Sequence, residues 1–275
     1  MTTDVRPFTI DIPDAQLDKL FARVRDYEWH DGPAEGGWRL GANLEFMKDL
    51  AAYWADGYDW RAAEAELNGF PQFLATIDDL DIHFIHVRSA RPDAQPILLS
   101  HGWPGSVLEF LDVIRPLAAP EDDTGPAFHV VVPSLPGYAF SGKPANPIGP
   151  RAMSGYFHKL MTDVLGYDGY VAQGGDWGSV VTAWLGFERA PACRAIHLNM
   201  FPVRPGVEID GKVVPAPPEG EAEKAWMQRG LGWMQSDGGY FHIQATRPET
   251  LSYAMLDSPV GTAAWIAEKM AYWMD

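Results

Sequence analysis

The chain has 275 residues, of which 47% are hydrophobic and 21% charged, a composition typical of a globular protein with a full core. Its formal net charge of −16 argues against nucleic acid or an anionic membrane surface as a partner, because both are negatively charged as well. Cys193 is the single cysteine, which excludes an intrachain disulfide. The sequence contains no long apolar run and does not begin like a signal peptide, so we expect no membrane span and a cytoplasmic location.

Residues 1–90 are expected to form a mostly helical leader that ends in the first strands of a sheet. Apolar residues at helical spacing predict three helices, over 16–24, 44–53 and 61–67. Asp14 is expected to cap the first of them. Around Asp78 and Asp79 the period changes to two, which predicts a pair of strands within residues 73–87.

Residues 91–200 alternate short apolar runs with amphipathic segments. The apolar runs predict strands over 96–100, 129–132, 169–172 and 195–198. The amphipathic segments predict helices over 107–114, 153–165 and 179–187. This alternation is typical of an α/β fold with a mostly parallel sheet, helices on both faces, and its chemistry on the loops that follow the strands.

Residues 201–275 differ in composition from the segment before them. Residues 201–220 are rich in proline, glycine and charge, and residues 221–275 have a helical pattern dense in tryptophan, tyrosine and methionine. Such a segment is typical of a cap over an apolar pocket. The alternative is that these aromatic residues form only the core of a helical layer.

The strand predicted over 169–172 is followed by Gly174-Gly-Asp176-Trp-Gly178, which has the spacing of a nucleophile elbow with aspartate in place of serine. An aspartate with an ordinary pKa of about 4 is ionised at neutral pH and needs no base before it attacks. A carboxylate attacks strained or activated sp³ carbon better than it attacks an amide. Asp176 is therefore the candidate nucleophile of a reaction on an epoxide or an alkyl halide; the alternative is an acidic residue at a helix N-terminus.

A second motif, Ser100-His-Gly-Trp-Pro104, follows the strand predicted over 96–100. In this position the backbone amide of Trp103 points at the reacting centre, and the amide of Trp177 supplies a second donor. We expect the two amides to form an oxyanion hole for the charge that develops on a carboxyl oxygen of Asp176 during ester hydrolysis. His101 is expected to be a buried structural residue that positions the turn.

Four further side chains are candidates for contact with a substrate. Two belong to the segment that follows the strand predicted over 129–132, which also reads as an ordinary proline-glycine turn. One belongs to the second motif and one to the aromatic C-terminal segment. The four are Pro104, Tyr138, Phe140 and Trp233.

Together, these motifs resemble the epoxide hydrolases of the α/β-hydrolase fold, specifically the microsomal and juvenile-hormone type. The resemblance extends over nearly the whole chain and includes Gly239-Tyr240-Phe-His-Ile-Gln244, Asp257-Ser-Pro-Val-Gly261 and Glu268-Lys269. It implies a leader over 1–90 that wraps a hydrolase core over 91–200, a helical lid over 201–275, and no cofactor. It also implies opening of an apolar epoxide to a vicinal diol through an ester of Asp176, with Tyr240 as the acid that protonates the alkoxide.

The chain departs from the family pattern beyond the lid. The family uses a histidine after the last strand, held by an acidic residue, to activate water. After Asp176 the only histidines are His197, within a predicted strand, and His242, within the lid. The second lid tyrosine also has no match. We therefore expect a C-terminally truncated sequence without the last core strands, poorly stable by itself, that is alkylated at Asp176 and then stalls as the ester.

Two other functions are compatible with the sequence. A haloalkane dehalogenase shares the elbow aspartate and would use the Trp177 indole N–H to bind the departing halide. A non-catalytic ligand-binding relative would account for the missing histidine. The expected partners of the leading interpretation are a small apolar epoxide and water, and a homodimer is also compatible with the sequence. Detoxification and biosynthesis use the same kind of site, so the pathway and the substrate are not defined.

Overall fold

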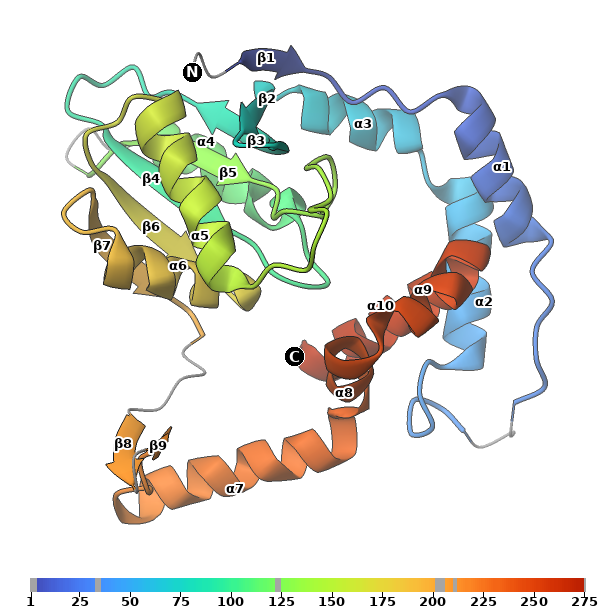
Figure 1. The fold of residues 1–275 in the computed structure, drawn as a ribbon. Helices are drawn as coiled ribbons and strands as arrows, with labels where there is room; N and C mark the ends of the chain where they lie inside the picture. Colours follow the sequence, from blue (N-terminus) through green and yellow to red (C-terminus); the bar gives the residue numbers. More distant parts are fainter. Residues whose placement is uncertain (1–3, 33–35, 122–124, 201–205, 210–211, 275) are drawn as a thin grey trace. The chain divides into compact units, whose positions relative to one another are not determined.

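The computed structural model of the protein describes residues 4–32, 36–121, 125–200, 206–209 and 212–274. The chain divides into two compact units (Figure 1). Unit 1 comprises Met1–Asp11 and Arg61–Val203, and unit 2 comprises Ile12–Trp60 and Arg204–Asp275. Residues 12–60 of the leader thus share a unit with the segment after the core.

Unit 1 is built on a seven-stranded sheet in the order β1-β2-β3-β5-β4-β6-β7. The strands are β1 Val5–Phe8, β2 Gln72–Ile77, β3 Leu80–Val87, β4 Gln95–Ser100, β5 Phe128–Pro133, β6 Tyr170–Gly174 and β7 Cys193–Leu198. The parallel pairing predicted for the core is present among β5, β4, β6 and β7. The leader strands β1, β2 and β3 add antiparallel pairs, so the sheet as a whole is mixed.

One antiparallel pair of the sheet, β2 with β3, results from a short connection. Only Asp78 and Asp79 separate β2 from β3, and such a tight turn can join antiparallel strands but not parallel ones. Asp78 has a positive φ of 55°, a conformation that aspartate tolerates better than most side chains. The strand pair predicted around these two residues is therefore confirmed.

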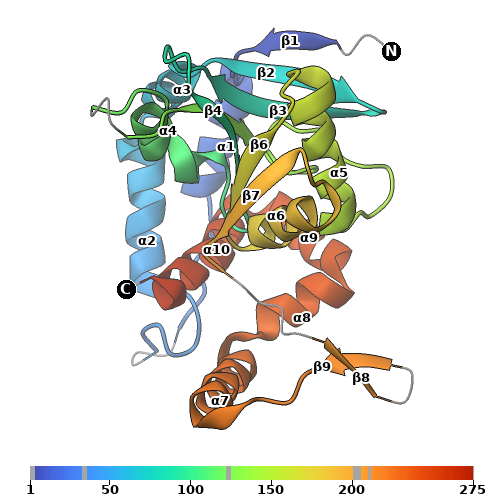
Figure 2. The ribbon, with the colours of Figure 1, turned by 90° about the vertical axis from the view of Figure 1, so that its left-hand side faces the viewer.

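Helices cover both faces of the sheet in unit 1. They are α3 Trp60–Asn68, α4 Leu111–Ala118, α5 Pro150–Lys159 and α6 Trp177–Glu188, with a 3₁₀ turn over Val107–Phe110 and a π turn over Leu160–Val164. Helices α5 and α6 lie on one face and α4 on the other (Figures 1 and 2). Successive strand residues point to opposite faces, so Leu98 packs with Phe157 and Leu185, whereas Leu99 packs with Ile114.

Three local expectations from the sequence differ from the structure. Strand β1 lies in a region expected to be helical; its Pro7 disfavours a helix and is tolerated because β1 is an edge strand. Asp14 does not cap the first helix but is its first residue, and the extended Pro13 occupies the N-cap position. A hairpin of β8 Gly206–Ile209 and β9 Lys212–Pro215 lies in the segment rich in proline, glycine and charge, for which no strand was predicted. Its signal was the Asp-Gly pair at 210 and 211 between two apolar runs.

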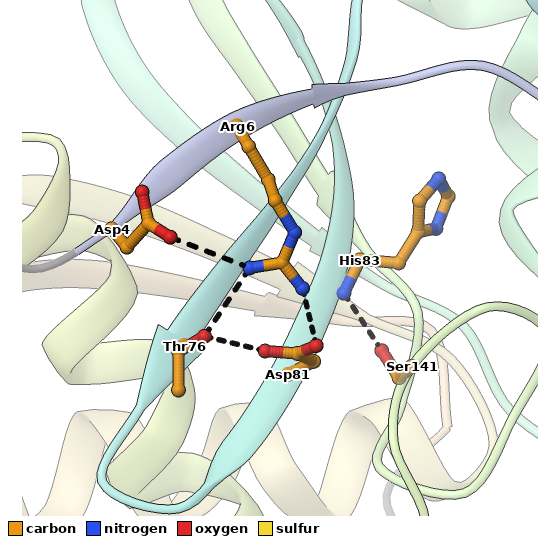
Figure 3. A network of polar contacts seen from close by, with 6 residues as sticks. All are labelled: Asp4, Arg6, Thr76, Asp81, His83 and Ser141. Atoms are coloured by element: carbon orange, nitrogen blue, oxygen red, sulfur yellow. Dashed lines mark hydrogen bonds and ion pairs between the residues drawn. The ribbon is translucent and has the colours of Figure 1, made fainter.

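A polar network fastens the first strands of the sheet to one another (Figure 3). The Arg6 guanidinium donates to the Asp81 carboxylate and to Thr76 Oγ1, 3.4 Å away, and forms an ion pair with Asp4 at 3.8 Å. The hydrogen bond from Thr76, together with the one from Arg6 and its charge, lowers the pKa of Asp81 below its usual value. On the neighbouring stretch of β3, the His83 amide donates to Ser141 Oγ at 3.0 Å. The hydrogen bonds of Arg6 tie β1 to β2 and β3, whereas the His83–Ser141 hydrogen bond ties β3 to the loop after β5.

Replacing Asp81 with asparagine is expected to destabilise the protein near neutral pH by about 0.5–1 kcal/mol, the usual worth of an exposed ion pair with additional hydrogen bonds. The pKa of Asp81 is lowered in the folded state, so its contribution is present above the unfolded-state pKa and is lost as pH falls through the lower folded-state value. Urea midpoints of wild type and Asp81→Asn should therefore differ near pH 7 and converge toward pH 3. A gap that stays constant with pH would contradict this account.

Unit 2 is mainly helical. Its helices are α1 Asp14–Arg25, α2 Leu44–Ala52, α7 Gly220–Asp237, α8 Gly239–Thr246, α9 Pro248–Asp257 and α10 Pro259–Trp273, with a π turn over Tyr53–Gly57. Val24 of α1, Met47 and Ala51 of α2, and Val260 of α10 form a buried apolar cluster. The helical pattern predicted for residues 221–275 is confirmed. In the part of the chain that the structure describes, no helix is long and apolar enough to cross a membrane.

Candidate active site

Asp176 sits at a sharp turn between β6 and α6, where a strand of the parallel sheet ends and a helix begins at Trp177. Its backbone has φ 50° and ψ −126°, a conformation that residues with a side chain rarely adopt. Strain of this kind costs about 1–3 kcal/mol and persists only where the surrounding structure enforces it. The elbow predicted from the glycine spacing is therefore present, and it presents the carboxylate of Asp176 at the carboxyl edge of the sheet.

The strained turn depends on a close approach between α6 and the neighbouring strand. A Cβ atom on Gly178 would lie 2.0 Å from the carbonyl oxygen of Ser100 and 2.6 Å from that of His101. A Cβ atom on Gly102 would lie 2.2 Å from Oδ1 of Asp176. Because the first two of these atoms belong to the backbone, no side-chain rearrangement could make room at Gly178. The two motifs recognised in the sequence are thus packed directly against each other.

The Asp176 carboxylate is held by a backbone amide of the second motif. The N–H of Trp103 donates to Oδ1 of Asp176 at 2.8 Å. The N–H of Trp177 is the first amide of α6, and helix geometry leaves such an amide without an intrahelical acceptor. Asp176 itself is the N-cap residue of α6, and its side chain makes no capping hydrogen bond to that helix. Of the two amides expected to form an oxyanion hole, that of Trp103 contacts the Asp176 carboxylate, and that of Trp177 follows Asp176 directly in the chain.

His101 has a structural place in this turn. Its Nε2 accepts the N–H of Leu135 at 3.1 Å, which leaves the proton on Nδ1 to be donated to the carbonyl of Gly102 at 3.0 Å. The side chain is fully buried, and that burial lowers the pKa of His101. Since both ring nitrogens are engaged with backbone groups, the imidazole has no free lone pair with which to accept a proton from water.

The loop after β5 brings one of the candidate substrate contacts to Asp176. The Tyr138 ring lies edge-on to His101, with centroids 5.4 Å apart. Burial, and secondly the charge of Asp176, raise the pKa of Tyr138 to about 12, so the phenol is neutral at physiological pH. Phe140, two residues further on, packs instead against Phe8 and His83, with ring centroids 5.1 and 5.3 Å away. Pro104 is adjacent to the Trp103 amide and is joined to Trp103 by a cis peptide bond.

Comparison with known proteins agrees with this geometry. Residues 5–110 match a family model described as epoxide hydrolase N terminus, and residues 95–237 match the alpha/beta hydrolase fold. Across 98% of its length the chain is 40% identical to a putative epoxide hydrolase of Stigmatella aurantiaca (strain DW4/3-1) and 34% identical to juvenile hormone epoxide hydrolase 1 of Ctenocephalides felis. The structure of Aspergillus niger epoxide hydrolase matches with a TM-score of 0.84 and 38% identity, over 97% of this chain and 69% of that one. The chain belongs to the epoxide hydrolase family.

Membership of the epoxide hydrolase family confirms both the resemblance noted in the sequence and the α/β-hydrolase fold class. The chain spans 61% of the length of the Stigmatella relative and 60% of that of the Ctenocephalides relative. Membership alone does not assign roles to individual side chains. The roles of Asp176, Tyr240, Trp103 and Trp177 therefore stay predictions. The geometry of unit 1 supports a contact between Asp176 and the amide of Trp103.

One charged residue near Asp176 was not predicted from the sequence. Glu109 is exposed as a whole, but its carboxyl group folds back over Gly105, where a Cβ atom would lie 1.3 Å from its Oε1. Burial of the carboxyl group, and secondly the negative charge of Asp176, raise the pKa of Glu109. The sequence feature that could have indicated this position is that Glu109 lies four residues, about one helical turn, after the last glycine of the Gly-Trp-Pro-Gly motif. A side chain at that spacing lies next to the motif.

Glu109→Gln is expected to stabilise the protein at alkaline pH. The pKa of Glu109 is higher in the folded state than in the unfolded state. Below the unfolded-state pKa the group is protonated in both states and costs no stability. As pH rises from that value through the folded-state pKa, the penalty for ionising the group in the folded protein grows to its full size. Thermal melts at pH 8 should therefore give a higher Tm for Glu109→Gln than for wild type, with the gain disappearing near pH 4. A variant that melts lower than wild type at pH 8 would contradict this placement of the charge.

The predicted lid residues lie in unit 2. Tyr240 is on α8 and Trp233 on α7, and their rings are 6.3 Å apart between centroids. His242 is also on α8, whereas His197 lies in β7 of unit 1 opposite Gln173. The structure thus confirms that one of these histidines belongs to a strand and the other to the helical segment after the core. The Tyr240 ring has the aromatic neighbours Trp233 and Trp273 within unit 2.

Proposed function

We propose that this chain opens an apolar epoxide through an ester between Asp176 and a substrate carbon. The observation that carries the proposal is the Asp176 carboxylate at a strained elbow, with the Trp103 amide 2.8 Å from its Oδ1. That hydrogen bond orients one carboxyl oxygen and leaves the other to attack. Family membership supports the epoxide as the electrophile.

In the first step a carboxylate oxygen of Asp176 forms a bond to an epoxide carbon as the ring C–O bond breaks. The electron pair of that bond goes to the ring oxygen, which takes the phenolic proton of Tyr240. A phenol with an ordinary pKa of about 10 stays protonated at neutral pH and yet can protonate a much more basic alkoxide. The products of this step are a hydroxyalkyl ester on Asp176 and the phenolate of Tyr240.

In the second step water attacks the ester carbonyl, and negative charge develops on a carboxyl oxygen of Asp176. The amides of Trp103 and Trp177 are the proposed donors to that oxygen. Collapse breaks the bond between the ester carbonyl carbon and the substrate oxygen. One proton of the water goes to that departing oxygen and completes the vicinal diol; the other returns to the Tyr240 phenolate, so that the phenol and the Asp176 carboxylate are both restored. His101 is not assigned as the base for this step, because both its ring nitrogens are occupied by backbone groups. Unless another residue activates the water, the ester is expected to accumulate.

The proposed substrate class rests on the aromatic composition of the proposed lid, which favours an apolar or aryl-bearing epoxide. The proposed substrate contacts are Pro104, Tyr138, Phe140 and Trp233. The relative from Ctenocephalides felis is named for juvenile hormone, and we propose no more from that name than a bulky apolar substrate. A cytoplasmic location, a role in detoxification and a homodimer are further proposals that rest on the sequence alone.

The proposed function is tested by offering the protein styrene oxide and benzyl bromide in separate incubations. We expect consumption of the epoxide with formation of an enzyme adduct, of phenylethanediol, or of both, measured by mass spectrometry and gas chromatography. Heat-treated protein controls for spontaneous opening. Bromide release without any reaction of styrene oxide would instead identify a haloalkane dehalogenase, and reaction with neither would contradict the covalent mechanism for this chain.

A further inference from the structure

Unit 2 contains a lysine in an unusual setting. Lys269 on α10 is 5% exposed, although lysine is among the residue types least often buried. A buried ammonium group is costly unless other groups compensate its charge. Here the compensation comes from two kinds of group, a carboxylate and the faces of aromatic rings. Such an arrangement places a fixed positive charge inside an otherwise aromatic part of the helical segment.

The aromatic partner of this charge is the ring of Tyr240. Nζ of Lys269 lies 4.8 Å from the centroid of the Tyr240 ring and 5.9 Å from that of Trp273, one turn further along α10. The rings of Tyr240 and Trp273 are in edge contact, with centroids 5.1 Å apart. A cation within about 6 Å of an aromatic face is attracted to it, most strongly where water is excluded. Lys269 therefore packs on the side chain proposed as the acid.

The carboxylate partner is Glu268, which forms an ion pair with Lys269. The Glu268 side chain is 20% exposed and that of Lys269 is 7% exposed, so water reaches the anion more readily than the cation. Solvent therefore screens the carboxylate better than it screens the ammonium group. Of the two charges, the less screened one is therefore the Lys269 ammonium group, whose Nζ lies 4.8 Å from the centroid of the Tyr240 ring.

We propose that Lys269 is a positioning residue for ring opening, acting through Tyr240; this inference rests on the proposed function. When Tyr240 gives its proton to the epoxide oxygen, negative charge moves onto the phenol. The ammonium group over the ring stabilises that charge more than it stabilises the neutral phenol, because a full anion replaces a quadrupole. The same contact fixes the ring orientation. Lys269 does not itself exchange a proton in this step.

The test is a double-mutant cycle on the rate at which styrene oxide alkylates the protein, followed by intact mass in single-turnover experiments. Lys269→Met keeps the apolar stem and removes the charge, and we expect it to slow adduct formation by about 10–100-fold, the scale of one well-placed charge. In a Tyr240→Phe background, the same change should alter the rate less than about twofold, because the phenolic proton is gone. Lys269→Arg, which retains the charge, should recover most of the rate.

Glu268→Gln is an independent test that leaves Lys269 in place. It can be measured even if Lys269→Met fails to fold. It removes the counter-charge, so adduct formation should be as fast as in wild type or faster. Two results would overturn the inference and leave a structural ion pair. The first is equal slowing by Lys269→Met in the wild-type and Tyr240→Phe backgrounds. The second is slowing by Glu268→Gln in a protein whose circular dichroism spectrum is unchanged. Failure of wild type to form any adduct would instead reject the proposed function on which the inference rests.

Discussion

Replacing Tyr240 with phenylalanine is expected to slow opening of styrene oxide by about 10²–10⁴-fold, the usual contribution of general acid catalysis. The leaving oxygen of an epoxide stays attached as an alkoxide, which is a poor leaving group unless it is protonated as the bond breaks. Phenylalanine keeps the ring that packs with Trp233 and Lys269 but has no proton to give. The measurement is the single-turnover rate of adduct formation, compared between the two proteins under the same conditions.

Tyr253→Phe is the matched control, since Tyr253 on α9 is 78% exposed and has no proposed role. It should react like wild type. A second control is an alkyl bromide, whose leaving group needs no proton, so Tyr240→Phe should alkylate with it as fast as wild type does. Equal rates of epoxide opening in wild type and Tyr240→Phe would remove Tyr240 from the mechanism.

Gly178→Ala is expected to destabilise the fold by about 3 kcal/mol or more and to abolish adduct formation. The added Cβ would lie 2.0 Å from the carbonyl oxygen of Ser100, and since that oxygen belongs to the backbone, relief requires α6 to move away from β4. Such a movement also withdraws the Asp176 elbow from the Trp103 amide. Urea unfolding and intact mass after incubation with epoxide measure the two effects separately.

Gly155→Ala makes the same substitution within a helix of the same unit, but there the nearest atom to the new Cβ is a side-chain nitrogen of Arg189 at 3.6 Å. Alanine has a higher helix propensity than glycine, so this variant should be as stable as wild type or more stable, by about 0.5–1 kcal/mol. If Gly178→Ala were as stable as Gly155→Ala, the close approach of α6 to β4 would be wrong.

The sequence predicted the fold well where periodicity and glycine spacing dictate it. The strands and helices of residues 91–200 and the Asp176 elbow appear where expected, because buried parallel strands and a strained turn require specific residue types. Strand β1 was missed because four residues around Pro7 carry too little periodicity to reveal an edge strand. The placement of Asp14 was missed because a cap and a first helical residue differ by one position, which pattern alone does not resolve.

The chemistry of the candidate site was predictable only in part. The Trp103 amide and Asp176 belong to two motifs whose relation is set by the order of parallel strands, so their contact followed from the fold. The engagement of His101 with the backbone of Leu135 and the approach of the Glu109 carboxyl group to Asp176 depend on side-chain directions in loops. Lys269 over Tyr240 is a contact between two helices, and a single sequence does not specify which of their faces meet.

The central claim is that the Asp176 carboxylate forms a covalent bond to the substrate. The most direct measurement is the intact mass of wild type and Asp176→Ala before and after incubation with styrene oxide, followed by peptide mapping of any adduct. We predict a gain equal to the mass of one epoxide in wild type, located on the peptide that contains Asp176, and no gain in Asp176→Ala. An adduct of the same mass in Asp176→Ala, or one mapped to another residue such as Cys193, would contradict the account.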